Sequence, residues 1–146
     1  MDTAAAISPG RVLARGVCRG LISHGGAALT EVTLSTGLRM DVLSVMATGE
    51  IWGVEVKSSR ADFTSDAKWP GYVDWCDRFH FAVPEGFPDE LLPADAGLLR
   101  ADRDGAEILR PGPLRRLAAP RRKALILRFA RLAADRLARL TVAPDL

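Results

Sequence analysis

The stretch Glu50–Arg60, EIWGVEVKSSR, decides the fold of this chain because it places an acid and a lysine inside an otherwise apolar run. β-Branched and aromatic residues dominate its first half and turn-forming residues bound it on both sides, a pattern that predicts a buried strand. Side chains alternate along a strand, so Glu55 and Lys57 share one face while Val54 and Val56 take the other. Two opposite charges therefore point the same way within the predicted strand.

These two charges have two interpretations. Burying an unpaired ion costs several kcal/mol, so a buried acid and lysine require a metal ion, an ion pair or a bound ligand beside them. Alternatively, the strand has one solvated face and the charges form a surface salt bridge. Because Glu-x-Lys is a weak motif by itself, the evidence for a functional site must come from the segment that precedes it.

That preceding segment, Arg39–Met46 (RMDVLSVM), is a second apolar run joined to the first by a short connection, Ala47–Glu50, that suits a hairpin turn. Antiparallel pairing brings Asp41, near the start of one strand, to the same end of the sheet as Glu55. Two carboxylates at one place repel each other unless a divalent cation lies between them, and hard oxygen ligands suit Mg²⁺ or Mn²⁺. The pattern therefore predicts a metal site, with Lys57 beside it.

The spacing of Asp41, Glu55 and Lys57 on consecutive strands resembles the PD-(D/E)xK nuclease superfamily, although Met40 stands where the superfamily name has a proline. A more specific resemblance lies in EVKSSRADFTSDAKWPGYVDWCDRFHFAVP, followed by GLLRADRDGAEILR and RRKALILRFARLAADRL. These segments are similar to the MmcB-type DNA-repair proteins of bacteria, and the similarity extends from about residue 11 to residue 140. It covers nearly the whole chain.

The resemblance implies an α/β fold with a restriction-endonuclease-like core, in which helices flank a mixed central β-sheet. It also implies a metal-dependent DNA endonuclease that acts in DNA repair. Asp41, Glu55 and the Val56 backbone carbonyl would hold Mg²⁺ or Mn²⁺, and Lys57 would orient the attacking water or stabilise charge on the phosphate. The alternative is a module on the same fold that binds DNA or a repair partner without cleaving.

Glu31 is a further candidate for the catalytic site. Many members of the superfamily carry a glutamate on the first helix, and the first predicted helix here has no acid. Glu31 lies in the middle of the next predicted strand, Ala28–Leu34, and is our candidate for an extra ligand or a carboxylate that supports the ligands. The alternative is an exposed strand residue with no such role.

The remaining pattern completes the predicted fold. Ser8-Pro9 is a typical helix start and His24-Gly25 a typical helix end. Arg11, Arg15 and Arg19 recur on one face of this helix, where they either meet phosphates or, as we favour, form a solvated face. Further elements are expected at the strand Arg78–Val83, the hairpin formed by Gly97–Ala101 and Ala106–Leu109, and the helix Arg121–Leu140.

The segment after Lys57 is predicted to be a helix that breaks near Trp69-Pro70, because proline cannot continue a helix. Arg60 and Lys68 are candidates for contact with the DNA backbone, since phosphates attract cations. Tyr72 is a third candidate, because aromatic rings stack on unpaired bases. At helical spacing, however, aromatic residues more often belong to the core.

Composition bounds the class of protein. The 146 residues suggest a single domain over 1–146, and two cysteines without a dense spacing fit a reducing compartment. The amino terminus lacks the basic and apolar regions of a signal peptide, and no apolar run is long enough for a membrane span. We therefore expect a cytoplasmic protein.

His80 alternates with two phenylalanines and is expected to be buried rather than to ligate zinc.

The charge distribution is lopsided. Residues 1–109 hold ten Lys/Arg against sixteen Asp/Glu, a net charge of −6, whereas residues 110–146 hold ten against two, a net charge of +8. Seven of the latter cations lie on the predicted helix over about 120–140, which favours contact with DNA, branched or single-stranded, through residues that include Arg121, Arg122 and Lys123. The open alternatives are an acidic repair partner, a solvated helix face or, for the whole chain, a homodimer.

Overall fold

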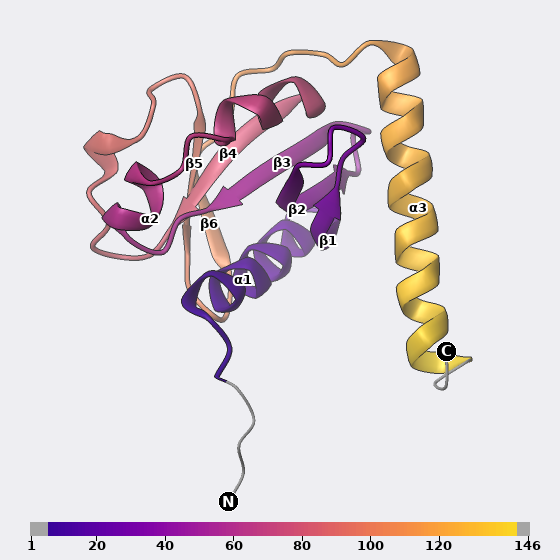
Figure 1. Cartoon of the computed structure of the whole chain (residues 1–146), viewed down its shortest axis with the longest axis horizontal. Coiled ribbons are helices and arrows are strands. Elements are labelled where there is room, and N and C mark those ends of the chain that lie inside the picture. The colour runs from indigo at the N-terminus through magenta and orange to yellow at the C-terminus, as the bar shows by residue number, and fades with distance from the viewer. Residues whose placement is uncertain (1–5, 143–146) are drawn as a thin grey trace, which may run out of the picture.

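The computed structural model describes residues 6–142, and in this range the chain forms a mixed six-stranded sheet with helices on both faces (Figure 1). The predicted α/β class is confirmed. In chain order the elements are α1 (Pro9–Ser23), β1 (Gly26–Thr33), β2 (Arg39–Met46), β3 (Ile51–Val56), α2 (Arg60–Thr64), η1 (Trp69–Trp75), β4 (Arg78–Val83), η2 (Asp89–Leu91), β5 (Gly97–Ala101), β6 (Ala106–Arg110) and α3 (Ala119–Thr141), where η marks a 3₁₀ helix. None of the described helices is long and apolar enough to cross a membrane.

The strands lie in the order in which they occur in the chain. β1, β2 and β3 pair antiparallel, β3, β4 and β5 pair parallel, and β6 returns antiparallel to β5. The hairpin between β2 and β3 forms where it was predicted, since the Gly49 amide donates to the Met46 carbonyl at 2.8 Å and Gly49 adopts φ +87. This hairpin fixes the register in which Val42 pairs with Val54. It therefore also fixes which residues meet at the far end of the two strands.

Helix α1 covers one face of the sheet and begins as predicted. The Ser8 hydroxyl accepts from the Arg11 amide, and Pro9 occupies the first turn. Its apolar residues join the sheet in a core that we call the α1 core, and Leu21 there is fully buried. Gly16 lets the helix approach the β5–β6 hairpin closely, because a Cβ at this position would lie 1.6 Å from the Asp102 carbonyl oxygen. The position of α1 over the sheet thus depends on this close contact.

The opposite face holds an aromatic core built from β4, α2 and η1. Phe79 and Phe81 of β4 pack edge to face with ring centroids 5.1 Å apart, and Trp69 contacts both rings. The helix predicted after Lys57 is only five residues long, since α2 ends at Thr64, and the predicted break near Trp69-Pro70 lies further on than the observed end of this helix. Pro70 lies in the first turn of a short 3₁₀ helix, which brings the chain back to the start of β4.

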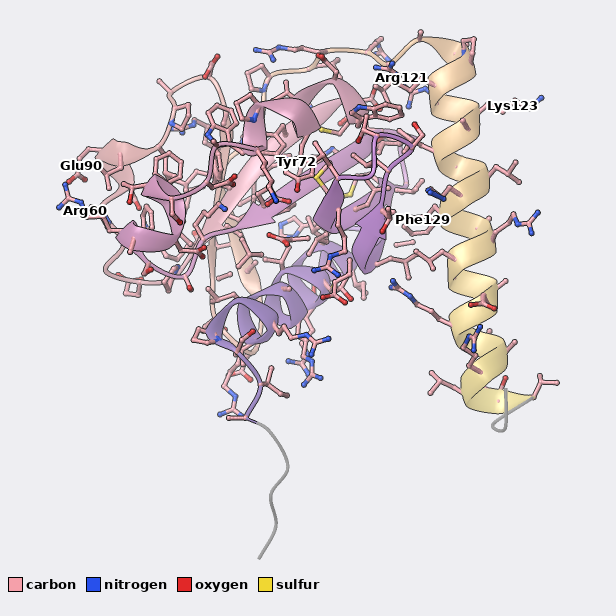
Figure 2. All side chains as sticks on the ribbon, viewed as in Figure 1. Arg60, Tyr72, Glu90, Arg121, Lys123 and Phe129 are labelled. Atoms are coloured by element: carbon pink, nitrogen blue, oxygen red, sulfur yellow. The ribbon has the colours of Figure 1, made fainter. Side chains whose placement is uncertain are left out.

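Helix α3 contacts the sheet mainly through its first half. Leu125 is its single buried residue, and Phe129 points toward the sheet (Figure 2). The second half of the helix does not pack on the domain in the same way, because Leu137 and Leu140 are 59% and 82% exposed. The physical reason is geometric: α3 lies beside the edge strand β1 and continues past its end (Figure 1).

The start of α3 is held by an ion pair between a buried aspartate and a partly exposed arginine. The guanidinium of Arg122 donates to both carboxylate oxygens of Asp77, at 2.7 and 2.6 Å, and the Ile51 and Leu117 amides donate to the same carboxylate. Asp77 is only 1% exposed. Burial by itself would raise the pKa of Asp77, but the hydrogen bonds from Arg122 and the two amides outweigh it and lower the pKa. Arg122 therefore has a structural role.

We predict that Arg122→Met lowers the free energy of unfolding by about 2–4 kcal/mol, because it leaves the Asp77 carboxylate buried without its cation. Urea denaturation at pH 7 measures this, with Arg116→Met, at an exposed arginine in the linker that precedes α3, as the control. The pKa of Asp77 is lowered on folding, so the contribution is present above the unfolded pKa and disappears as the pH falls through the folded value. Equal effects of the two substitutions at pH 7 would contradict the assignment.

Candidate functional site

The site begins with two carboxylates that meet where β2 and β3 end. The register of the hairpin places Asp41 opposite Glu55, as the sequence predicts. Each acid accepts a hydrogen bond from the backbone of the other strand: the Asp41 amide donates to Glu55 Oε1 at 3.0 Å, and the Val56 amide donates to Asp41 Oδ2 at 2.8 Å. The two side chains are therefore fixed by the strand pairing itself.

The two carboxylates cannot both be ionised in this position at low cost. Burial, followed by the charge of Asp41, raises the pKa of Glu55 to about 9. Burial also raises the pKa of Asp41, although the hydrogen bond from the Val56 amide opposes this shift. A pair of acids with such pKa values holds a shared proton or a cation at neutral pH.

The donor set fits a hard divalent cation. In an extended strand the N–H and C=O of one residue point to the same side, so the Val56 carbonyl faces Asp41 as its amide does. The recorded pairing between β2 and β3 ends at Val42 and Val54, before this carbonyl. Two carboxylates and one carbonyl, with room for water, match the way in which proteins hold Mg²⁺. Within residues 6–142, no cluster of three or more His, Cys, Asp or Glu side chains has metal-binding geometry.

Lys57 lies beside the acids but is also held by a third one. Its Nζ donates to Asp66 Oδ2 at 2.6 Å, and the two side chains are 7% and 12% exposed. Hydrogen bonds from Lys57 and from the Lys68 amide lower the pKa of Asp66 in spite of its burial. The positive charge of Lys57 also favours the ionised forms of Asp41 and Glu55. Lys57 thus links the two carboxylates to the segment after α2.

Glu31 lines the same pocket, in an unusual backbone conformation. It stands opposite Asp41, between the pairs Thr30–Val42 and Val32–Met40, and its φ is +52, which makes it the single non-glycine residue with positive φ in the described part of the chain. A left-handed residue reverses the alternation of side chains, and Val32 accordingly packs in the aromatic core. The Glu31 carboxylate lies 3.7 Å from Arg11. Its predicted part in metal binding stays a prediction.

Helix α3 supports this strained backbone. Arg136 donates from its two terminal nitrogens to the Thr30 and Glu31 carbonyls, at 2.7 and 3.0 Å. Arg128 donates to the Thr33 carbonyl on the same edge. These contacts protect the unpaired edge of β1, which would otherwise be open to another strand. They also connect a helix far away in the sequence to the residue opposite Asp41.

The pocket around the acids has a volume of about 570 Å³ and a rim rich in arginine. Arg11 and Arg15 come from α1 and Arg39 from the start of β2. Asp62 completes the lower wall and accepts from the Ser58 amide at 3.0 Å. The pocket therefore combines an acidic floor with a cationic rim.

Tyr72 occupies a position that does not fit its predicted contact with DNA. Its side chain is buried, and its hydroxyl donates to the Arg39 carbonyl at 3.0 Å. Burial, followed by the charges of Glu55 and Asp41, raises the pKa of Tyr72 to about 12. We assign Tyr72 to the core beneath the site, which is the alternative that the helical spacing of the aromatic residues left open.

The remaining residues that the sequence assigns to DNA contact lie outside the pocket. Arg60 and Lys68 are exposed, and Figure 2 shows Arg60 at the edge of the molecule away from α3. Arg122 holds the ion pair with Asp77, and Arg121 lies 4.1 Å from the centroid of the Trp75 ring. Lys123 is exposed and points away from the sheet (Figure 2).

The sequence did not predict two contacts of the site: Asp66 with Lys57, and Arg136 with the backbone of β1. Asp66 was visible only as a polar residue near the broken helix, and nothing in its spacing to Lys57 indicates an ion pair. Arg136 is one of seven cations on α3, and its neighbours on the sheet are more than a hundred positions away. The one signal that could have found Asp66 is weak: it is an acid nine residues after Lys57, in the segment that follows the Glu-x-Lys strand.

We predict that Glu55→Gln stabilises the metal-free protein at high pH. Because the folded pKa of Glu55 is raised to about 9, its stabilising effect is complete below the unfolded pKa and is lost as the pH rises toward 9. Glutamine keeps an acceptor for the Asp41 amide, and it avoids the free-energy cost of ionising a buried carboxyl group at high pH. Urea denaturation in EDTA should show a gain of about 1–3 kcal/mol at pH 8 and a smaller one at pH 5. A loss of stability at both pH values would refute the pKa shift.

We also predict that Arg136→Met lowers the free energy of unfolding by about 1–3 kcal/mol, since it removes two charged hydrogen bonds to β1. Arg139→Met is the matched control, because Arg139 reaches only the exposed Asp135 one turn away and should cost about 0.5 kcal/mol or less. Introducing Glu31→Gly into the Arg136→Met variant should recover part of the loss, since glycine accepts positive φ. No recovery would show that the contact does not support Glu31.

Comparison with known proteins agrees with this fold. A solved structure of a protein of unknown function from Silicibacter pomeroyi shares 51% sequence identity with this chain, covers 97% of each of the two chains and superimposes with a TM-score of 0.92. Among curated proteins no match was found. A family model described as "DNA repair protein MmcB-like" matches residues 5–144. The chain therefore belongs to the MmcB-like family of DNA-repair proteins.

Proposed function

We propose that this protein is a metal-dependent DNA endonuclease that acts in DNA repair. The observation that carries the proposal is the contact between Asp41 and Glu55, whose carboxylates are held together by strand pairing and both have raised pKa values. Such a pair would be tolerated with a proton or a cation between the acids. Membership of a DNA-repair family supports DNA as the substrate.

Each residue of the pocket has a distinct part in the proposed hydrolysis of a phosphodiester bond. Asp41, Glu55 and the Val56 carbonyl would hold Mg²⁺ or Mn²⁺. The cation, when bound, makes water a better nucleophile and offsets charge on the phosphate. Lys57, fixed by Asp66, keeps its ammonium beside the acids, where it would orient the attacking water or stabilise the charge that develops on the phosphate oxygens.

The strand order around the acids supports membership of the PD-(D/E)xK superfamily. Asp41 lies on β2 and Glu55 and Lys57 lie on or just after β3, with β4 parallel to β3 on its other side. This is the order that the resemblance implies for a restriction-endonuclease-like core. We include the superfamily assignment in the proposal, because the fold and the positions of these three residues agree with it.

A second candidate function is a module that binds DNA or a repair partner without cleaving it. The observation that favours it is the Lys57–Asp66 ion pair, in which the lysine is already neutralised by the protein. The two candidates differ in their response to metal. An enzyme with this site gains stability from Mg²⁺ or Mn²⁺, whereas a module without the site gains none.

We predict that the protein nicks or cuts DNA in the presence of Mg²⁺ or Mn²⁺ and that Glu55→Gln, Asp41→Asn and Lys57→Ala each lower the rate by at least about 100-fold. The assay compares supercoiled plasmid with flap, fork and single-stranded oligonucleotides. Glu107→Gln, an exposed acid on β6, is the control and should cleave like the wild type. If all variants cut as fast as the wild type, a contaminating nuclease explains the activity and the proposal fails.

A further inference from the structure

Three exposed arginines, which we call the rim, line the same pocket as the more buried paired acids. Arg11 and Arg15 are four positions apart on α1 and share one face of the helix, and Arg39 is the first residue of β2. The floor below them is formed by Asp41 and Glu55. A cationic rim over an acidic floor would attract an anionic ligand that also coordinates a cation at the floor.

The three arginine side chains remain available to such a ligand. Arg15 and Arg39 are exposed, and over residues 6–142 neither side chain has a hydrogen bond or ion pair with the protein. Arg11 is 68% exposed and reaches Glu31 at 3.7 Å, which is a long contact. Guanidinium groups bind phosphate oxygens through two parallel hydrogen bonds, so each free arginine offers a complete phosphate site.

Unlike the three arginines of the rim, most cationic side chains of α3 already have partners within the protein. Five of its seven cationic side chains already contact the described part of the protein, through the residues Arg121, Arg122, Arg128, Arg136 and Arg139. Only Lys123 and Arg131 have no such contact among the described residues. The predicted DNA-binding surface along α3 therefore loses most of the side chains that would form it.

We propose that Arg11, Arg15 and Arg39 bind the phosphates that flank the scissile bond, so that the DNA strand crosses the first half of α1 instead of following α3. This inference rests on the proposed function, because it takes the paired acids as the point of cleavage. The ligand class is the DNA sugar-phosphate backbone. Phosphate contacts of this kind position a strand without reading its sequence.

Glu31 has a defined place in this arrangement. Its carboxylate lines the same pocket and lies 3.7 Å from Arg11. A phosphate that binds Arg11 therefore lies near the negative charge of Glu31. Removing that charge therefore favours DNA binding. If Glu31 were instead a metal ligand, removing its charge would weaken metal binding.

The test measures binding of fluorescein-labelled 30-nucleotide DNA, as single strand, duplex and flap, by fluorescence anisotropy in Ca²⁺ at several salt concentrations. Arg15→Gln and Arg39→Gln should each weaken binding several-fold, and the double variant more than tenfold. The slope of log affinity against log salt should fall by about 0.7–0.9 for each arginine removed. The matched control is Lys123→Gln with Arg131→Gln on α3, which should change affinity less than twofold. Glu31→Gln should tighten binding.

Three outcomes would overturn the proposal: a wild-type protein that binds none of the probes, a loss of affinity in the α3 variant but not in the Arg15 and Arg39 variants, or Arg15 and Arg39 variants that keep the wild-type affinity. A second measurement distinguishes a failure of this inference from a failure of the proposed function. It records, by thermal unfolding, whether Mn²⁺ stabilises the wild type and each variant. If Mn²⁺ stabilises the wild type and the variants alike while DNA affinity is unchanged, the inference about the rim fails and the metal site stands. If Mn²⁺ stabilises none of them, the proposed function itself fails.

Discussion

The contact between Asp41 and Glu55 is the constraint on which the rest of this structure depends. Each carboxylate accepts an amide from the opposite strand, so the hairpin that pairs β2 with β3 also builds the site. The arrangement opposes stability in the absence of a cation, because burial and mutual repulsion favour protonation of at least one acid. A fold selected only for stability would have little reason to keep two acids in contact. The contact between two buried acids is the physical argument for the proposed metal ion.

Several distant parts of the chain converge on this pair. The Asp66 carboxylate holds Lys57, and α3 holds the backbone of Glu31 through Arg136. Glu31 has a positive φ, a conformation that costs free energy in a non-glycine residue and that is commonly found at functional sites. The basic C-terminal helix thus serves as a brace for the edge strand next to the site. Most of its cationic side chains contact other parts of the protein, and for this reason we propose the rim of the pocket, in place of α3, as the surface for DNA.

Much of the fold was predictable from the sequence, because strand alternation, the proline and glycine positions and the helix cap are local signals. The bounds of β2 and β4 agree with prediction, β3 ends one residue before Lys57, and Asp41 meets Glu55 as predicted. What escaped prediction depends on contacts between residues far apart in sequence. In the sequence, nothing distinguishes Arg122 from the other cations of α3, because its partner Asp77 is 45 positions away. Likewise, no local pattern indicates that Leu137 and Leu140 extend beyond the sheet.

The most direct test of the central claim is a crystal of the protein soaked in Mn²⁺, with data collected to locate anomalous scattering. We predict one strong anomalous peak within coordination distance of Asp41, Glu55 and the Val56 carbonyl, which disappears in a Glu55→Gln crystal treated in the same way. The absence of any peak beside Asp41 at millimolar Mn²⁺, with Asp41 and Glu55 still in contact, would contradict the account. The two acids would then share a proton and hold no metal.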